Sequence, residues 1–214
     1  MYSVVAFFQK GGMFMYPILL VFAVGISIAA ERWFQLTRTR SQNRKVWSQV
    51  EPALVKGEFE KARNMVDKDK STISQMLSMG LARQGAVRRR EDIEIAMEES
   101  MMEIIPQLEK RTQYVGLLSN IATLLGLLGT IMGLIEAFTA VANANPAEKA
   151  DLLSASISVA MNTTAFGLMV AIPLLLIHAK LTSTTGHIVD SLEMASVKAL
   201  NSISNFTKRQ SSTD

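Results

Sequence analysis

An apolar stretch from about residue 115 to 142 constrains this chain most, because it is long enough to cross a bilayer as a helix. Small residues recur on one helical face within it, and a second stripe of small residues follows downstream. Helices in lipid associate by close packing, so each stripe predicts a helix that packs tightly against protein neighbours. The stripes comprise Ser119, Ala122, Gly126, Gly129, Thr130, Gly133, Ala137 and Ala140, and then Ser156, Ala160, Thr164, Gly167 and Ala171. We expect Gly126, Gly129, Gly133, Gly167 and Ala171 to serve helix packing.

The composition favours a membrane protein over a soluble one. Of the 214 residues, 49% are hydrophobic and only 19% are charged, and the apolar residues lie in blocks of spanning length. The absence of cysteine excludes disulfides, thiol catalysis and cysteine-ligated metals. The net charge of +3 does not indicate nucleic-acid binding, because the basic residues cluster beside the predicted spans, where membrane topology explains them.

The first apolar span, residues 13–30, predicts the orientation of the chain. One cation, Lys10, precedes the span, whereas five follow it closely. Basic residues favour the cytoplasmic side, so the N-terminus is expected outside and the residues after the span inside. The apolar run exceeds the core of a normal signal peptide, and we interpret it as a retained anchor. The five cations are Arg32, Arg38, Arg40, Arg44 and Lys45.

These patterns predict an all-α integral membrane protein with three transmembrane helices, of which the second and third extend into a cytoplasmic helical domain. Residues 90–108 have helical spacing and run into the second span with only Pro106 interrupting, so we expect one long helix kinked at Pro106. The expected parts are an outer-interface amphipathic segment (1–12), transmembrane helix 1 (13–30), a cytoplasmic helical domain (31–113), transmembrane helix 2 (114–142), a periplasmic loop (143–153), transmembrane helix 3 (154–179) and a cytoplasmic C-terminal helix (180–214).

Thr130 and Thr164 are the first candidates for an ion pathway. A threonine in a membrane helix usually bonds a carbonyl one turn earlier, and each could be a self-satisfied packing residue. Both hydroxyls, however, lie on the small-residue stripes that turn toward protein rather than lipid. Together they could present oxygens to a passing ion or bond the carboxyl group of a partner. The sequence leaves both alternatives open.

Three further polar residues lie within the spans. Asn162 and Thr163 are unusually polar for mid-span positions, and at about 100° per residue Asn162 points almost opposite to Thr164. Glu136 is the sole acidic residue in the second or third span, about 9 Å along the axis from Thr130. It is either a functional intramembrane carboxylate or a side chain that reaches the outer interface.

No pattern in the sequence supports an enzyme. There is no phosphate-binding Gly-Lys-Ser/Thr loop and no nucleophile elbow. His178 and His187 have no acidic or cysteine partner at a spacing that suits a metal. We therefore expect neither enzymatic activity nor a cofactor.

Several motifs occur in an order that resembles the MotA/TolQ/ExbB family of ion-channel subunits, in particular its ExbB branch. The similarity covers nearly the whole chain in order and spacing, and the motifs of the second and third spans are its specific part. The matching pieces are Lys10-Gly11-Gly12, Met15-Tyr16-Pro17-Ile18, Glu31-Arg32, the run from Gly126 to Gly133, Ala137-Phe138, Thr164-Ala165-Phe166-Gly167-Leu168 and Ala171-Ile172-Pro173.

The resemblance implies a homo-pentamer in the inner membrane that encloses two single-span, ExbD-like partner chains, each with an aspartate in its span. Such a motor uses the proton-motive force to power a TonB-like periplasmic protein for outer-membrane uptake. By motif position, Thr130 and Thr164 match the channel-lining threonines of the family. A TolQ-like subunit, a flagellar-stator-like subunit and a non-conducting membrane adaptor are the alternatives.

The chain departs from the family pattern at three places. Val159 follows Ile157-Ser158 where many ExbB and TolQ chains carry a glutamate, which weakens any proton route through that residue. Thr123 stands where a proline often precedes the glycine-rich run, so the second helix is expected to be less kinked there. The extra polar pair Asn162-Thr163 could supply oxygen ligands to sodium, because hard cations favour oxygen.

Overall fold

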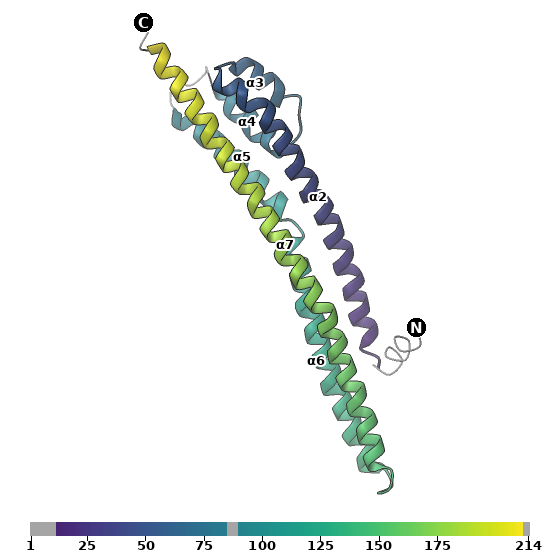
Figure 1. The fold of residues 1–214 in the computed structure, drawn as a ribbon. Helices are drawn as coiled ribbons and strands as arrows, with labels where there is room; N and C mark the ends of the chain where they lie inside the picture. The colour runs from purple at the N-terminus through teal and green to yellow at the C-terminus, as the bar shows by residue number, and fades with distance from the viewer. Residues whose placement is uncertain (1–11, 85–89, 212–214) are drawn as a thin grey trace. The chain divides into compact units, whose positions relative to one another are not determined.

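The computed structural model describes residues 12–84 and 90–211, with side chains to residue 206, and these residues form six helices (Figure 1). The predicted amphipathic segment 1–12 lies outside them except for Gly12. The helices are α2 (Met15–Val55), α3 (Phe59–Val66), α4 (Thr72–Arg83), α5 (Arg90–Glu109), α6 (Thr112–Asn143) and α7 (Lys149–Ser211).

Three helical stretches are long and apolar enough to cross a membrane, judged by length and composition: Met15–Val55, Arg90–Asn143 and Lys149–Phe206. The described residues contain no β-strand, which confirms the prediction of an all-α membrane protein with three spans. Contacts between residues divide the chain into two compact units. We call them the membrane unit (described residues 12–32 and 111–181) and the helical unit (33–110 and 182–211).

The prediction of one long helix kinked at Pro106 was wrong. Pro106 lies inside α5, and the helix is instead interrupted at residues 110–111, between α5 and α6. Arg111 there has a φ of 65°, a left-handed conformation that costs a non-glycine residue about 1–2 kcal/mol. Its guanidinium compensates by pairing with both carboxylate oxygens of Glu31, at 2.7 and 2.9 Å. The break is therefore stabilised by a residue 80 positions away, which no local pattern reveals.

The helical unit has its own apolar core, built from α3, α4, α5 and parts of α2 and α7. Leu77, Met97 and Leu192 are fully buried in it. The N-terminus of α4 is closed by Asn43, whose side chain bonds the Thr72 hydroxyl at 2.7 Å and accepts from the backbone N–H of Ile73 at 3.3 Å. Asn43 is only 3% exposed, so these hydrogen bonds take the place of the ones that water would make to the Asn43 amide on α2 and to the first turn of α4.

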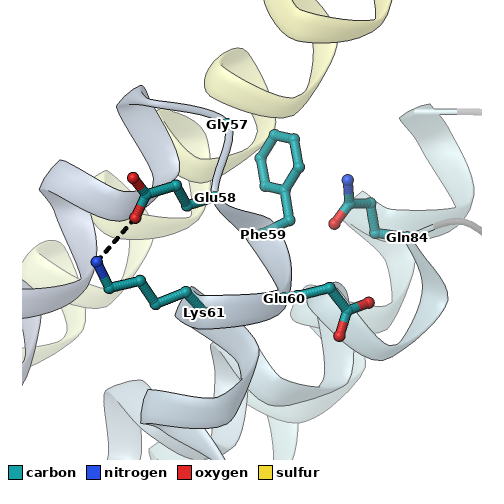
Figure 2. Close-up of a pocket in the computed structure, with 6 residues that line it drawn as sticks. All are labelled: Gly57, Glu58, Phe59, Glu60, Lys61 and Gln84. Atoms are coloured by element: carbon teal, nitrogen blue, oxygen red, sulfur yellow. Dashed lines mark hydrogen bonds and ion pairs between the residues drawn. The ribbon is translucent and has the colours of Figure 1, made fainter.

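The turn between α2 and α3 requires its glycine. Gly57 has a φ of 78°, and a side chain there would collide with the ring of Phe206, which packs edge-to-face on Phe59. A pocket of about 470 Å³ lies beside this turn. Figure 2 shows the residues that line it and the ion pair of Glu58 with Lys61. Glu60 and Gln84 also line this pocket, and all three of its charged side chains, Glu58, Glu60 and Lys61, are exposed to solvent.

Candidate ion pathway

Two threonines from different helices meet in the membrane unit, where α6 and the first half of α7 run side by side (Figure 1). The hydroxyls of Thr130 on α6 and Thr164 on α7 are hydrogen-bonded to one another. Thr164 Oγ1 also donates to the carbonyl of Gly126 at 2.9 Å. Thr130 Oγ1 lies 3.3 Å from that carbonyl and 3.4 Å from the carbonyl of Ala160. The structure thus joins the two residues that the sequence singled out into one polar cluster, which we call the threonine pair.

The small-residue stripes bring the two helices close enough for this contact. A Cβ on Gly126 would lie 3.3 Å from the Cα atoms of both Gly167 and Thr164. A Cβ on Gly167 would lie only 2.8 Å from the carbonyl oxygen of Ala122, and one on Gly133 only 3.0 Å from the Cβ of Ala160. Backbone-to-backbone packing of this kind is how helices associate in lipid.

A second polar contact joins the two helices about two to three turns from the threonine pair. Ser119 on α6 donates from Oγ to the carbonyl of Ala171 on α7, at 2.7 Å, and both residues are buried. With the packing glycines, it fixes the register of the two helices, so the threonine hydroxyls stay level with one another.

Helix α2 packs against one side of the α6–α7 pair. Phe14, which precedes α2, lies beside Gly129, since a Cβ there would be 3.3 Å from the Cβ of Phe14. Further along α2, Gly25 lies against the side chain of Leu174. Gly129 is about 100° around α6 from Thr130. Because Thr130 and Thr164 are only half-buried, the threonine pair keeps an open edge on the side away from α2.

The threonine pair has unused acceptor capacity. A hydroxyl has one proton to donate and two lone pairs to accept with. The two hydroxyls have two protons to donate to one another and to two carbonyl oxygens, so some of their lone pairs are left without a donor. Such oxygens can accept a hydrogen bond from a protonated carboxyl group or contact a cation.

The other predicted pathway residues lie apart from this pair. Thr163 is 2% exposed, donates to the carbonyl of Val159 at 3.0 Å and packs against Gly129, on the α2 side. Asn162 is half-buried, about 160° around α7 from Thr164. Glu136 is exposed, about 9 Å along α6 and about 120° around it from Thr130.

Two polar residues of α6 that the sequence analysis did not assign to the pathway are exposed on its open side: Asn120 and Thr123. The signal that could have found Thr123 is its spacing of seven residues from Thr130, which returns a helix to almost the same face. Among residues 12–84 and 90–211, no group of three His, Cys, Asp or Glu side chains is placed to hold a metal ion.

Comparison with known proteins identifies the family of this chain. Residues 68–194 match the model of the MotA/TolQ/ExbB proton channel family. The chain is 31% identical over 170 residues to "Biopolymer transport protein exbB1" of Vibrio cholerae, covering 77% of this chain and 73% of that protein. It is 29% identical over 197 residues to "Putative biopolymer transport protein ExbB homolog" of Methanothermobacter thermautotrophicus, covering 90% and 67%.

A third relative is "Putative biopolymer transport protein ExbB-like 1" of Synechocystis sp., 29% identical over 189 residues, with 86% of this chain and 72% of that protein covered. The family match includes α4 to α6 and most of α7, and therefore both threonines of the pair. This chain belongs to the MotA/TolQ/ExbB proton channel family.

Proposed function

We propose that this chain is the ring-forming, ion-conducting subunit of an inner-membrane motor that uses the proton-motive force, with an ExbD-like partner, to drive a TonB-type periplasmic protein. In this proposal the chain is not an enzyme and the ring is a homo-pentamer. The N-terminus lies in the periplasm, and the helical unit lies in the cytoplasm. The observation that carries the proposal is the threonine pair, a hydroxyl cluster open on one side of a close-packed, membrane-spanning helix pair.

Within the part of the chain that the structure describes, no carboxyl group lies at the level of the threonine pair. Glu136, the acidic residue within the α6 span, is about 9 Å away on a different face, and Val159 occupies the family's glutamate position. A proton that moves through the membrane needs a titratable group near the middle of its route. We therefore assign that group to a second protein, which fits a single-span partner with an aspartate.

The pair can then serve as a docking point for that carboxyl group. When protonated, the carboxyl donates to a threonine oxygen; when ionised, it cannot donate and is better solvated by water. A unit charge that crosses 100 mV releases about 2.3 kcal/mol. This is more than one hydrogen bond of about 0.5–1.5 kcal/mol, so each transfer can move the partner from one subunit's pair to the next.

Replacement of both hydroxyls tests the proposal. Thr130→Val with Thr164→Val keeps the side-chain shape and removes both oxygens, and the native complex with its co-purifying partners is reconstituted into vesicles. Thr139→Val is the matched control, because Thr139 is an exposed α6 threonine that bonds its own helix, at the carbonyl of Ile135. We expect potential-driven proton uptake to fall at least about tenfold in the double variant, the loss of roughly 1.4 kcal/mol of stabilisation, and to stay normal in the control.

Normal uptake in an assembled double variant would favour the adaptor alternative instead. One observation supports that alternative: each hydroxyl already has a hydrogen-bond partner across the helix interface, as a purely structural contact requires. An adaptor tolerates the loss of both hydroxyls if the packing glycines are intact.

Ion identity has its own test. Proton uptake that continues in sodium-free buffer and disappears with a proton uncoupler supports proton coupling. Output that needs sodium and survives the uncoupler would support the sodium-driven variant, for which Asn162 and Thr163 are the candidate ligands. Their separation from the threonine pair makes the proton the better supported ion.

A further inference from the structure

An amide side chain lies exposed deep within the α6 span. Asn120 is eight residues into α6, about 12 Å along the axis from Thr112. The exposed, ion-paired Arg111 and Glu31 mark the level at which this end of the membrane unit meets water or headgroups. Asparagine is too short to reach back over such a distance, unlike lysine or arginine.

Contact with lipid would be costly for Asn120. An amide without a hydrogen-bond partner costs about 1–3 kcal/mol in an apolar environment. Ser119, its neighbour in sequence, turns instead into the α6–α7 interface and is buried there with a partner. An exposed amide at this depth therefore indicates a surface that touches water or polar atoms of another chain rather than lipid tails.

Asn120 is also aligned with the threonine pair. Thr123 is seven residues from Thr130, so it lies within about 20° of the same face, and Asn120 lies within about 80°. Both are exposed on the side of α6 away from α2. Along the axis they lie about 10 and 15 Å from Thr130, toward the Arg111 end. On α7, the large side chains exposed at this level are apolar, Leu168, Met169 and Ile172 among them, so the polar line lies on α6.

We propose that Asn120 and Thr123 line the cytoplasmic half of the ion path and conduct protons between the threonine pair and the water at the Arg111 end. This inference rests on the proposed function. Thr123 bonds its own helix at the carbonyl of Ser119, 3.2 Å away, and keeps its lone pairs for water. The Asn120 amide both donates and accepts, so it can hold a water chain in either orientation.

The absence of cysteine allows a direct test of hydration, because an introduced thiol is the sole one in this chain. Asn120→Cys, Thr123→Cys and Ile121→Cys are made in the native complex, and a charged thiosulfonate reagent is added from the cytoplasmic side of membrane vesicles. Ile121 is the control, since it lies about 1.5 Å from Asn120 in depth and about 100° around the helix. The modified fraction of this chain is read by intact mass.

We expect the cysteines at 120 and 123 to react at least about tenfold faster than that at 121, because only a hydrated thiol ionises and reacts. Equal rates at 120 and 121 would overturn the proposal. For conduction, Asn120→Leu should lower proton uptake severalfold while Asn120→Gln retains it; uptake unchanged by Asn120→Leu would also overturn it.

These outcomes separate the inference from the function on which it rests. If the threonine variants abolish uptake but the thiol at 120 is unreactive, the proposed function stands and the inference fails. If the thiol reacts quickly but the native complex conducts no ion, the hydrated surface stands and the proposed channel function fails.

Discussion

A single methyl group at Gly167 should loosen the α6–α7 contact. The Cβ of Gly167→Ala would lie 2.8 Å from the carbonyl oxygen of Ala122 and 3.0 Å from the Cα of Gly126. Ordinary contacts begin near 3.4 Å, and both neighbours are backbone atoms that cannot rotate away. The helices must therefore separate by about half an ångström, which weakens every dispersion contact along the stripe.

The magnitude follows from two opposed terms. Overpacking of a tight interface costs about 1–3 kcal/mol, whereas alanine in place of glycine within a helix returns about 1 kcal/mol. Because both contacts are with backbone atoms, the overpacking cost should lie in the upper part of its range, about 2–3 kcal/mol, which leaves a net destabilisation of about 1–2 kcal/mol. Gly186→Ala is the matched control on the same helix, because no atom lies within 4 Å of its added Cβ. It should stabilise the protein by about 0.5–1 kcal/mol, so the two variants should move in opposite directions.

The assay is denaturant unfolding in a lipid–detergent mixture, followed by helical circular dichroism, with proton uptake measured in parallel. The Gly167 variant should also lose uptake, because separation of the helices lengthens the hydrogen bonds of the threonine pair. Equal stability of the two alanine variants would refute the reasoning that backbone contact at this glycine holds the membrane unit together.

Substitutions at Arg111, Asn43 and Asp69 give three further predictions, each measured by thermal or denaturant unfolding. Arg111→Gly should be more stable than Arg111→Ala by about 1 kcal/mol, since glycine adopts positive φ freely. Equal stabilities of the two variants would contradict the claim that the left-handed backbone at residue 111 is strained. Asn43→Ala should cost about 1–3 kcal/mol, because it leaves the backbone N–H of Ile73 and the hydroxyl of Thr72 without their buried partner. Replacement of the exposed Asn201 by alanine should cost less than about 0.5 kcal/mol, and similar costs for the two variants would argue against the role of Asn43. Hydrogen bonds from Ser71 hold the pKa of Asp69 below its ordinary value of 3.8. The carboxylate therefore stabilises the fold above that pH, and this contribution is lost as the pH falls through the lowered pKa. The natural protein should be more stable than the Asp69→Asn variant at neutral pH, and this difference should shrink below about pH 4. A difference that does not change with pH would contradict this linkage.

The contact between Thr130 and Thr164 was accessible from the sequence. Small residues at helical spacing identified the packed faces of the two helices. A short connection after Asn143 makes the helices antiparallel, so residues at similar distances from it along the chain, such as Thr130 and Thr164, lie at the same level. What periodicity did not resolve was which neighbouring helix each polar residue meets. Thr163 and Thr164 are adjacent in sequence, yet Thr163 faces the α2 side and Thr164 its partner threonine.

The features that sequence reasoning missed depend on contacts between distant residues. The break at Arg111 has no glycine or proline signal and is held by Glu31. Closure of the α4 N-terminus by Asn43 likewise joins residues about thirty positions apart, which a local pattern cannot encode. Pro106, the strongest local signal in that region, is accommodated inside α5, where the carbonyl of Pro106 still accepts from the N–H of Lys110.

The central claim is that this chain conducts protons by presenting its threonine pair to a carboxyl group on another protein. The most direct measurement is potential-driven proton uptake by the native complex before and after treatment with a carboxyl-modifying carbodiimide, with the modified residue identified by mass spectrometry. We predict that uptake is lost and that the modified residue lies in a co-purifying single-span chain. No uptake by the untreated complex, or loss of uptake with modification at Glu136 alone, would contradict the claim.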